Sequence, residues 1–159
     1  MKRALILFIL IFVSIGAYAN MISFIVIETG LKPDPEKEVF HQHSALWENA
    51  FLDVFFDAGF IVSNAPILRV EKKPSGNILN TALINISDAR EWGIDFVLIA
   101  QLDYTTDSKT PSEILFYLYQ TSPEKKILEN REKLNLSKNP RDEYEGIKTI
   151  VRGLIPYIK

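Results

Sequence analysis

One short pattern occurs twice in this chain: a helical stretch, a glycine, and an apolar strand that begins at once. It covers "DAGFIVSN", around Gly59, and "EWGIDFVLIA", around Gly93. Glycine readily adopts the left-handed backbone that closes a helix, and the apolar run after it predicts a strand. Helices that return directly to strands are laid over the face of a sheet. The repeated pattern therefore predicts an architecture of helices packed on a sheet.

The elements before each glycine follow from apolar spacing. The β-branched run from Ile22 to Gly30 has the composition of a central strand. From Ser44 to Ala58 the apolar residues recur at helical spacing, which predicts a long amphipathic helix. Its apolar positions are Leu46, Trp47, Ala50, Phe51, Val54, Phe55 and Ala58, and Phe56 is also expected in the core.

The middle of the chain predicts shorter elements. We expect a strand over 60–66, a polar connection over 68–77 and a helix over 78–86. Ser87 or Asp88 is the expected cap of a further helical turn that ends at Trp92. The strand over 95–104 begins apolar on both faces and then alternates, so we expect its Gln101 and Asp103 to be half exposed.

The last third of the chain predicts a hairpin and a closing helix. The runs 113–121 and 127–137 flank a charged, proline-containing turn, which indicates two antiparallel strands. Asn139 followed by Pro140 is typical of a helix start, and Pro156 is expected to end or kink that helix. The whole order predicts an α/β (α+β) fold with a single mixed β-sheet and helices packed on it.

Residues 1–19 have the pattern of a secretory signal peptide. A basic start precedes an apolar run, and Ala17 and Ala19 stand in the small-x-small spacing of a cleavage site. Cleavage before Asn20 leaves a single α/β domain over 20–159. The apolar run is shorter than the ~20 residues of a membrane-spanning helix, so we expect no stable membrane span after cleavage. A retained membrane anchor stays an alternative, because the chain remains apolar beyond Asn20.

Composition restricts the compartment and the partners. The chain has no cysteine, which excludes disulfides and an acylated N-terminal cysteine, and a secreted protein of this kind fits a bacterial periplasm. Without Lys2 and Arg3, 16 of the 18 basic residues remain against 20 acidic ones, a net charge of −4. That balance argues against nucleic acid as a partner, since phosphate binding needs a basic surface.

No catalytic or cofactor-binding motif is present, so we expect neither a catalytic residue nor a cofactor. The histidines His41 and His43 are weak candidates for metal ligands, because imidazole is an ordinary zinc ligand. Residues two apart on a helix point in nearly opposite directions, so a solvated helix entry is the alternative. The carboxylate pairs on the predicted helices, Asp53 with Asp57 and Asp88 with Glu91, are expected on their wet faces.

Two residues are candidates for contact with a ligand or a partner. Glu28 stands at the carboxyl end of the first strand, where open α/β sheets place ligand groups, although a structural carboxylate is the alternative. Trp47 lies near the start of the long helix, and tryptophan is enriched at protein interfaces, although burial in the core is the alternative.

The second glycine pattern resembles the periplasmic domains of the curli secretion protein CsgG, the penicillin-binding-protein activator LpoB and the flagellar protein FlgT. In those domains a helix that ends "A-x-x-x-G-A-D-Y-V-L-x-G" leads into a central strand. The matching residues here are Ala89, Arg90, Gly93, Asp95, Val97, Leu98 and Ile99. The order of elements agrees over residues 22–155.

The resemblance implies a non-enzymatic envelope protein that docks onto a larger assembly. Two departures limit it: there is no cysteine to acylate, and the connection 105–112 is too short for a pore-forming hairpin. We therefore expect a periplasmic or secreted binding or assembly module of the bacterial envelope, with an envelope protein of unknown identity as its partner. The alternatives are a small enzyme or small-ligand-binding protein with its site near Glu28, and a homo-oligomeric structural subunit.

Overall fold

A computed structural model describes residues 19–31, 42–74, 76–104, 110–134 and 139–159 of the chain. Its strands are β1 (Met21–Thr29), β2 (Ile61–Asn64), β3 (Leu68–Val70), β4 (Phe96–Tyr104), β5 (Pro111–Thr121) and β6 (Glu124–Lys133). Its helices are α2 (Gln42–Asp57), α3 (Ile78–Thr81), α4 (Ile86–Glu91), α5 (Pro140–Arg152) and the 3₁₀ turn η1 (Ile155–Tyr157).

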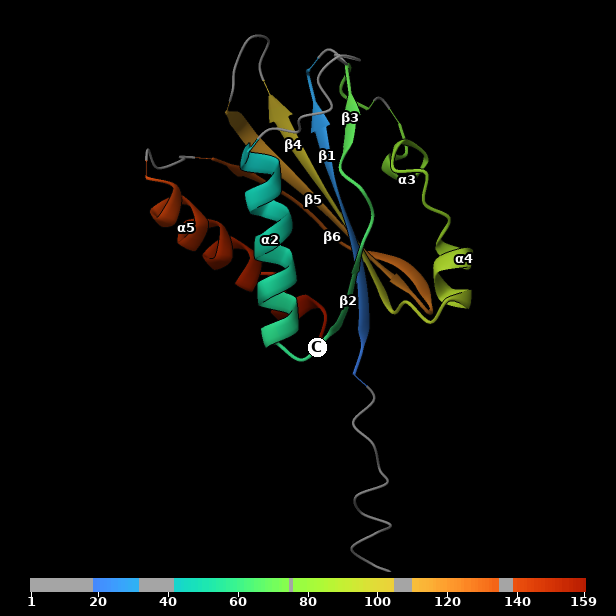
Figure 1. The fold of residues 1–159 in the computed structure, drawn as a ribbon. Helices are drawn as coiled ribbons and strands as arrows, with labels where there is room; N and C mark the ends of the chain where they lie inside the picture. The colour runs from blue at the N-terminus through green and yellow to red at the C-terminus, as the bar shows by residue number, and fades with distance from the viewer. Residues whose placement is uncertain (1–18, 32–41, 75, 105–109, 135–138) are drawn as a thin grey trace, which may run out of the picture.

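The strands form one mixed sheet in the order β2-β1-β4-β5-β6. β1 is parallel to β4, whereas β4, β5 and β6 are successively antiparallel. β2 and β3 both pair with the same edge of β1, β2 with Met21–Phe24 and β3 with Ile27–Thr29. The predicted fold, a single mixed sheet with helices packed on it, is confirmed (Figure 1).

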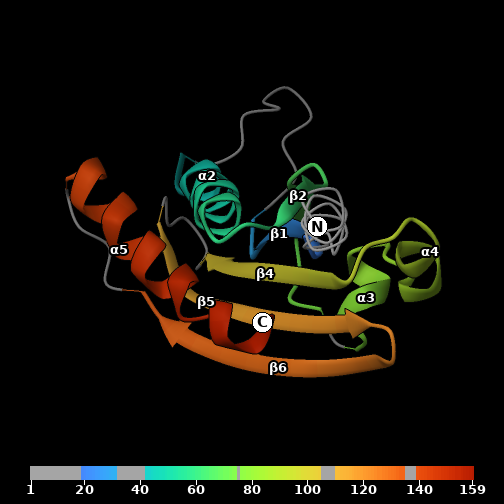
Figure 2. The same cartoon turned by 90° about the horizontal axis from the view of Figure 1, so that it is seen from below.

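Helices cover both faces of the sheet because β1 and β4 are apolar on both sides. α2 and α5 pack on one face, and α3 and α4 pack on the other (Figures 1 and 2). The strand residues under α2 and α5 are Ile22, Phe24, Val26, Leu98, Ala100, Leu102, Ile114, Phe116 and Leu118. Those under α3 and α4 are Ile25, Ile27, Val97 and Ile99. Side chains that alternate along each strand thus build two separate cores.

Both glycines of the repeated pattern have the predicted left-handed backbone, with φ of +88° at Gly59 and +77° at Gly93. The N–H of Phe60 donates to the carbonyl of Phe55, and the N–H of Ile94 donates to the carbonyl of Ala89. These bonds close α2 and α4 in the same way.

The caps of the small helices differ from the prediction. Asn85, rather than Ser87 or Asp88, caps α4, because its side chain accepts a hydrogen bond from the N–H of Ser87. The helix predicted over 78–86 is only the single turn α3, which Asn77 caps. Leu83, with φ of 55°, interrupts the helical backbone between the two asparagine-capped turns.

Three boundaries are also corrected. Leu68–Val70, predicted as part of a polar connection, forms β3 by pairing with the end of β1. β6 begins at Glu124, so the charged residues after Pro123 belong to the strand. α5 starts at Pro140 as predicted, but it ends at Arg152, before Pro156.

Two predictions of burial are wrong. Phe56 is 75% exposed, because it lies on the face of α2 that points away from the sheet. Gln101 and Asp103 were expected to be half exposed, but each is 4% exposed, since the second face of β4 is covered along its length.

The predicted signal peptide lies outside the described residues except for Ala19, so Ala17 and the cleavage site remain predictions. No helix in the described part of the chain is long and apolar enough to span a membrane.

Candidate protein-binding surface

Glu28, predicted as a ligand contact, is buried at the carboxyl end of β1 with 0% exposure. One carboxylate oxygen accepts a hydrogen bond from Oγ of Ser44 at 2.6 Å. The other accepts one from Nε of Arg69 at 2.7 Å and lies 2.6 Å from Nη2 of the same guanidinium. The carboxylate is therefore engaged within the fold, where it ties β1 to α2 and β3.

Tyr104 extends this buried cluster on β4. Its hydroxyl lies 3.0 Å from Oγ of Ser44, and burial raises the pKa of Tyr104 far above its usual value. The phenol therefore stays neutral, and the Ser44 hydroxyl links it to the Glu28 carboxylate. The cluster holds neighbouring elements together, which agrees with the structural alternative for Glu28.

His43, the described member of the histidine pair, joins the first turns of α2 and α5. Its Nδ1 pairs with Oε1 of Glu143, whose side chain is 4% exposed. His41 lies outside the described residues. Within the described ranges no group of three or more His, Asp or Glu side chains is arranged to hold a metal ion. Here His43 serves as a helix-to-helix contact.

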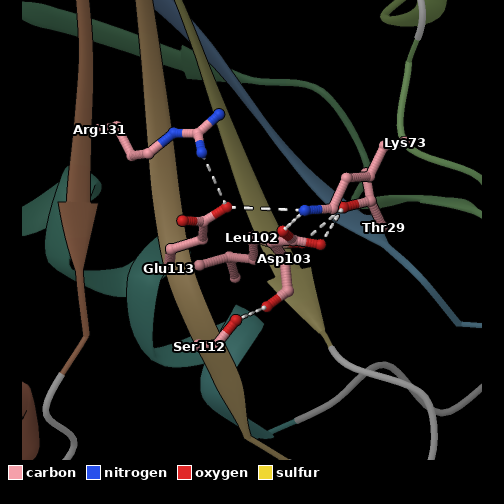
Figure 3. Close-up of polar contacts among 7 residues, drawn as sticks. All are labelled: Thr29, Lys73, Leu102, Asp103, Ser112, Glu113 and Arg131. Carbon is pink, nitrogen blue, oxygen red and sulfur yellow. Dashed lines mark hydrogen bonds and ion pairs between the residues drawn. The ribbon is translucent and has the colours of Figure 1, made fainter.

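A second polar cluster lies on the opposite face of the sheet, at the carboxyl end of β4 (Figure 3). Asp103 and Glu113 are direct cross-strand neighbours on β4 and β5. Lys73 pairs with Asp103 and lies 3.6 Å from Oε1 of Glu113, while Arg131 lies 3.4 Å from the same oxygen. The hydrogen bond and charge of Asp103 raise the pKa of Lys73. Two cations thus balance two carboxylates, which stabilises the pairing of β4, β5 and β6.

Trp47 lies in the core and is 0% exposed, so it has no surface to offer to a partner. Its ring packs against the rings of Phe51 and Phe116, each with centroids 5.9 Å away. Its position on the inner face of α2 explains this, since the same face carries Ala50, Phe51 and Val54. Core burial, the alternative named for Trp47, is what the structure shows.

Exposed apolar side chains lie in two grooves near β2, one that includes Ile61 and Val62 of that strand and one that reaches Ala65, the residue just after it. Five large hydrophobic residues of the described chain are exposed: Phe56, Ile61, Leu83, Trp92 and Tyr157. The first four line two grooves, so we name the two grooves together the β2 surface. The exposed fractions of Phe56 and Trp92 are each 75%, and that of Leu83 is 87%.

The first groove of the β2 surface, the α2 groove, lies between the end of α2 and β2 and has a volume of about 490 Å³. Its walls are Leu52, Asp53, Phe56, Asp57, Phe60, Ile61 and Val62. The second, the α4 groove, lies between α4 and the start of β1 and has a volume of about 230 Å³. Its walls are Ser23, Phe24, Ala65, Ala82, Leu83, Ile84, Asn85, Asp88, Ala89, Trp92, Ile94 and Val97.

α5 fixes the rim of the α2 groove through Asp53. The hydroxyl of Tyr144 donates to Oδ2 of Asp53 at 2.6 Å, and Nζ of Lys148 lies 3.4 Å from the same oxygen. The hydrogen bond from Tyr144 lowers the pKa of Asp53. Burial and the Asp53 carboxylate raise the pKa of Tyr144 to about 12. Asp57 and Asp88 are exposed and form no ion pair with the described residues.

The exposure of Ile61, Leu83 and Trp92 was not among the predictions from the sequence. Trp92 carried the clearest signal, because it directly precedes the glycine that ends α4, and helix ends lie at the surface of a sheet protein. Leu83 carried none, since its exposure follows from the left-handed backbone that interrupts the predicted helix.

Comparison with known proteins gives a family and several distant structures. A family model described as "Uncharacterised protein" matches residues 32–115. No curated protein matches the sequence. TolB from Acinetobacter baumannii is 16% identical with a TM-score of 0.45, and the match covers 87% of this chain but only 27% of TolB.

Two smaller proteins match along most of their length. A PelC dodecamer from Paraburkholderia phytofirmans is 11% identical with a TM-score of 0.44, covering 90% of this chain and 91% of that one. A lipoprotein from Neisseria meningitidis is 12% identical with a TM-score of 0.40, covering 87% of this chain and 97% of that one. The resemblance to the CsgG, LpoB and FlgT domains stays a prediction.

Proposed function

We propose that this chain, which belongs to the family described as "Uncharacterised protein", is a non-enzymatic protein-binding module of the bacterial cell envelope. The observation that supports this function is the β2 surface. Among the described residues, four of the five exposed large hydrophobic side chains line its two grooves. Contiguous exposed apolar residues with a polar rim are typical of sites where another protein binds.

The chemistry of the β2 surface favours a protein partner. Trp92 and Phe56 supply large apolar areas, and aromatic side chains contribute much of the binding energy in protein interfaces. Their exposure in the free chain leaves apolar surface in contact with water. Covering it releases free energy at about 25 cal/mol per Å².

The burial and hydrogen bonding of the Glu28 carboxylate argue against a catalytic site at the end of β1 and so favour a binding role for the protein. Both of its carboxylate oxygens accept hydrogen bonds from Ser44 and Arg69, and its side chain has no exposed surface. A catalytic carboxylate or a ligand contact must reach the molecule on which it acts. A small enzyme or small-ligand-binding protein at this position is therefore the less favoured alternative.

The predicted compartment comes from the sequence. The signal-peptide pattern of residues 1–19, with Ala17 and Ala19 at the cleavage site, predicts export. The absence of cysteine fits a bacterial periplasm better than a disulfide-rich extracellular space. The partner we propose is accordingly a protein of the envelope.

Photo-crosslinking from the β2 surface tests this function. A photoreactive residue replaces Trp92 in one variant and Phe56 in a second, and envelope fractions are irradiated with each. The matched control carries the same residue at Lys125, an exposed position on β6. We expect one specific protein to be crosslinked from positions 92 and 56 and not from position 125.

Other outcomes decide between the alternatives. Failure to crosslink any specific protein, or equal yields from the control position, would overturn the proposed function. A product that consists of two copies of this chain would support the homo-oligomeric subunit instead.

A further inference from the structure

Within the described residues, the backbone of β2 has no neighbouring strand on the side away from β1. The N–H of Ile61 donates to the carbonyl of Asn20, and the N–H of Ala65 donates to the carbonyl of Phe24. Backbone groups alternate in direction along a strand, so the N–H and C=O of Val62 and Asn64 point away from β1. Among the described residues these outward groups have no strand partner, because β2 ends the sheet.

The two edges of the sheet differ in charge. β6, the opposite edge, reads "EKKILENREK" and is mostly charged and exposed. Lysines and other charges on an edge strand oppose the addition of a further strand. β2 reads "IVSN" and carries no charge. In the part of the chain that the structure describes, the β6 edge of the sheet is thus protected by charge and the β2 edge is not.

Acidic residues border the open edge. The ionisable residues that line the two grooves are Asp53, Asp57 and Asp88, and neither groove is lined by a lysine or an arginine. Asp53 is engaged by Tyr144 and Lys148, whereas Asp57 and Asp88 are exposed without an ion pair among the described residues. In the described part of the chain, each groove of the β2 surface therefore combines apolar walls with an aspartate that has no ion pair.

The geometry points to strand addition: β2 accepts an extended segment of a partner protein that carries both apolar and basic side chains on each of its two faces. The outward groups of Val62 and Asn64 hydrogen-bond the backbone of that segment. Successive side chains of the segment point to opposite faces of the sheet. Apolar side chains on one face enter the α2 groove and those on the other enter the α4 groove, while basic side chains on the same two faces meet Asp57 and Asp88. Such strand addition obtains affinity from backbone bonds and specificity from alternate pockets. This inference rests on the proposed function and names the kind of partner.

Selection from a phage-displayed library of short random peptides tests the inference on the immobilised protein. We expect enriched peptides to combine apolar and basic residues and to carry a net positive charge. Binding of a selected peptide should weaken by about tenfold with Val62→Pro, which removes an outward N–H but no bond to β1. The double variant Asp57→Lys with Asp88→Lys, which reverses the charge in each groove, should also weaken binding of the peptide. The matched control, Glu124→Lys with Glu145→Lys, makes the same change in net charge outside the grooves and should leave binding unchanged.

A second measurement does not depend on any variant of the protein. The selected peptide is synthesised with N-methyl groups at alternate residues, in the two possible registers. Only the register whose N–H groups face β2 should lose binding, by about tenfold. The other register is the matched control.

The outcomes separate this inference from the proposed function. No enrichment, enrichment of acidic or uncharged peptides, or equal binding by both N-methylated registers would overturn strand addition. If strand addition is overturned but crosslinking from position 92 still captures a specific protein, the proposed binding function stands. If crosslinking fails, the binding function itself falls.

Discussion

The carboxylate of Glu28 accepts a hydrogen bond from Nε of Arg69 at 2.7 Å, and the two residues are 41 positions apart in the sequence. The pair joins β1 to β3, the shortest strand of the sheet. Because the Glu28 side chain is 0% exposed and that of Arg69 is 16% exposed, the charges depend on each other rather than on water.

Removing the Arg69 side chain should therefore destabilise the folded chain. We expect Arg69→Met to lower the free energy of unfolding by about 3–5 kcal/mol, because it removes the guanidinium that pairs with a buried carboxylate. Adding Glu28→Gln should recover part of that loss. Urea denaturation of both single variants and the double variant measures the coupling. Additivity within about 0.5 kcal/mol would show that the two side chains act independently.

Gly30 and Gly93 share a left-handed backbone but differ in the space around them. A Cβ on Gly30 would lie 2.1 Å from the carbonyl oxygen of Tyr104, whereas a Cβ on Gly93 would meet nothing within 4 Å. We expect Gly93→Ala to lower the free energy of unfolding by about 1–2 kcal/mol through backbone strain alone, and Gly93→Val to lower it further. Gly30→Ala should cost above about 3 kcal/mol, because β1 and β4 must also separate. Equal melting temperatures for Gly30→Ala and Gly93→Ala would contradict this contrast.

The two tryptophans should report separate regions in fluorescence. Trp47 is 0% exposed and Trp92 is 75% exposed, and the chain has no other tryptophan. We expect Trp92→Phe to leave an emission that is shifted to the blue and resists quenching by acrylamide. Stability should change by no more than about 0.5 kcal/mol, since the side chain lies at the surface. Strong quenching of the remaining tryptophan would show that Trp47 is not enclosed.

The contact between Tyr144 and Asp53 should produce a distinct alkaline titration. The pKa of Tyr144 is raised from 10.0 to about 12 in the folded chain, so the fold favours the protonated phenol. Its contribution to stability is complete below pH 10 and is lost as the pH rises through about 12. The pKa of Asp53 is lowered in the folded chain. Its contribution to stability is therefore complete when the pH is above the ordinary pKa of an aspartate, and it is lost as the pH falls through the lower pKa of the folded chain.

Phenolate absorbance, taken as the difference between the wild type and Tyr144→Phe, measures the first of these titrations. We expect Asp53→Asn to shift its midpoint towards lower pH, because the carboxylate no longer opposes the phenolate. The matched control is Tyr157→Phe, which removes an exposed tyrosine outside this contact. A midpoint that does not move in Asp53→Asn would show that burial alone raises the pKa of Tyr144.

The sequence predicted the elements that depend on local chemistry. The apolar stripe from Trp47 to Phe55 specifies α2, and Gly59 and Gly93 end their helices as expected. Asn139 and Pro140 begin α5 because capping needs only neighbouring residues. Each of these features is determined within a few positions of the chain, which is why spacing and composition identify it.

The features that sequence analysis missed depend on distant residues. β3 has three residues and forms by pairing with the end of β1, so no local pattern distinguishes it from a loop. The burial of Asp103 follows from Lys73, which reaches it from the segment after β3. The role of Glu28 could be suspected from its strand-end position, but Ser44 and Arg69 become its partners only once the sheet is assembled.

The difference in charge between the two edges of the sheet also limits how copies of the chain can associate. A strand that joins β2 becomes part of a sheet whose far side is the charged strand β6, which discourages further growth. The charges on β6 therefore oppose its pairing with β2 of another copy, so copies of this chain should not join their sheets edge to edge. A chain built in this way caps an extended partner and does not propagate a sheet from one copy to the next.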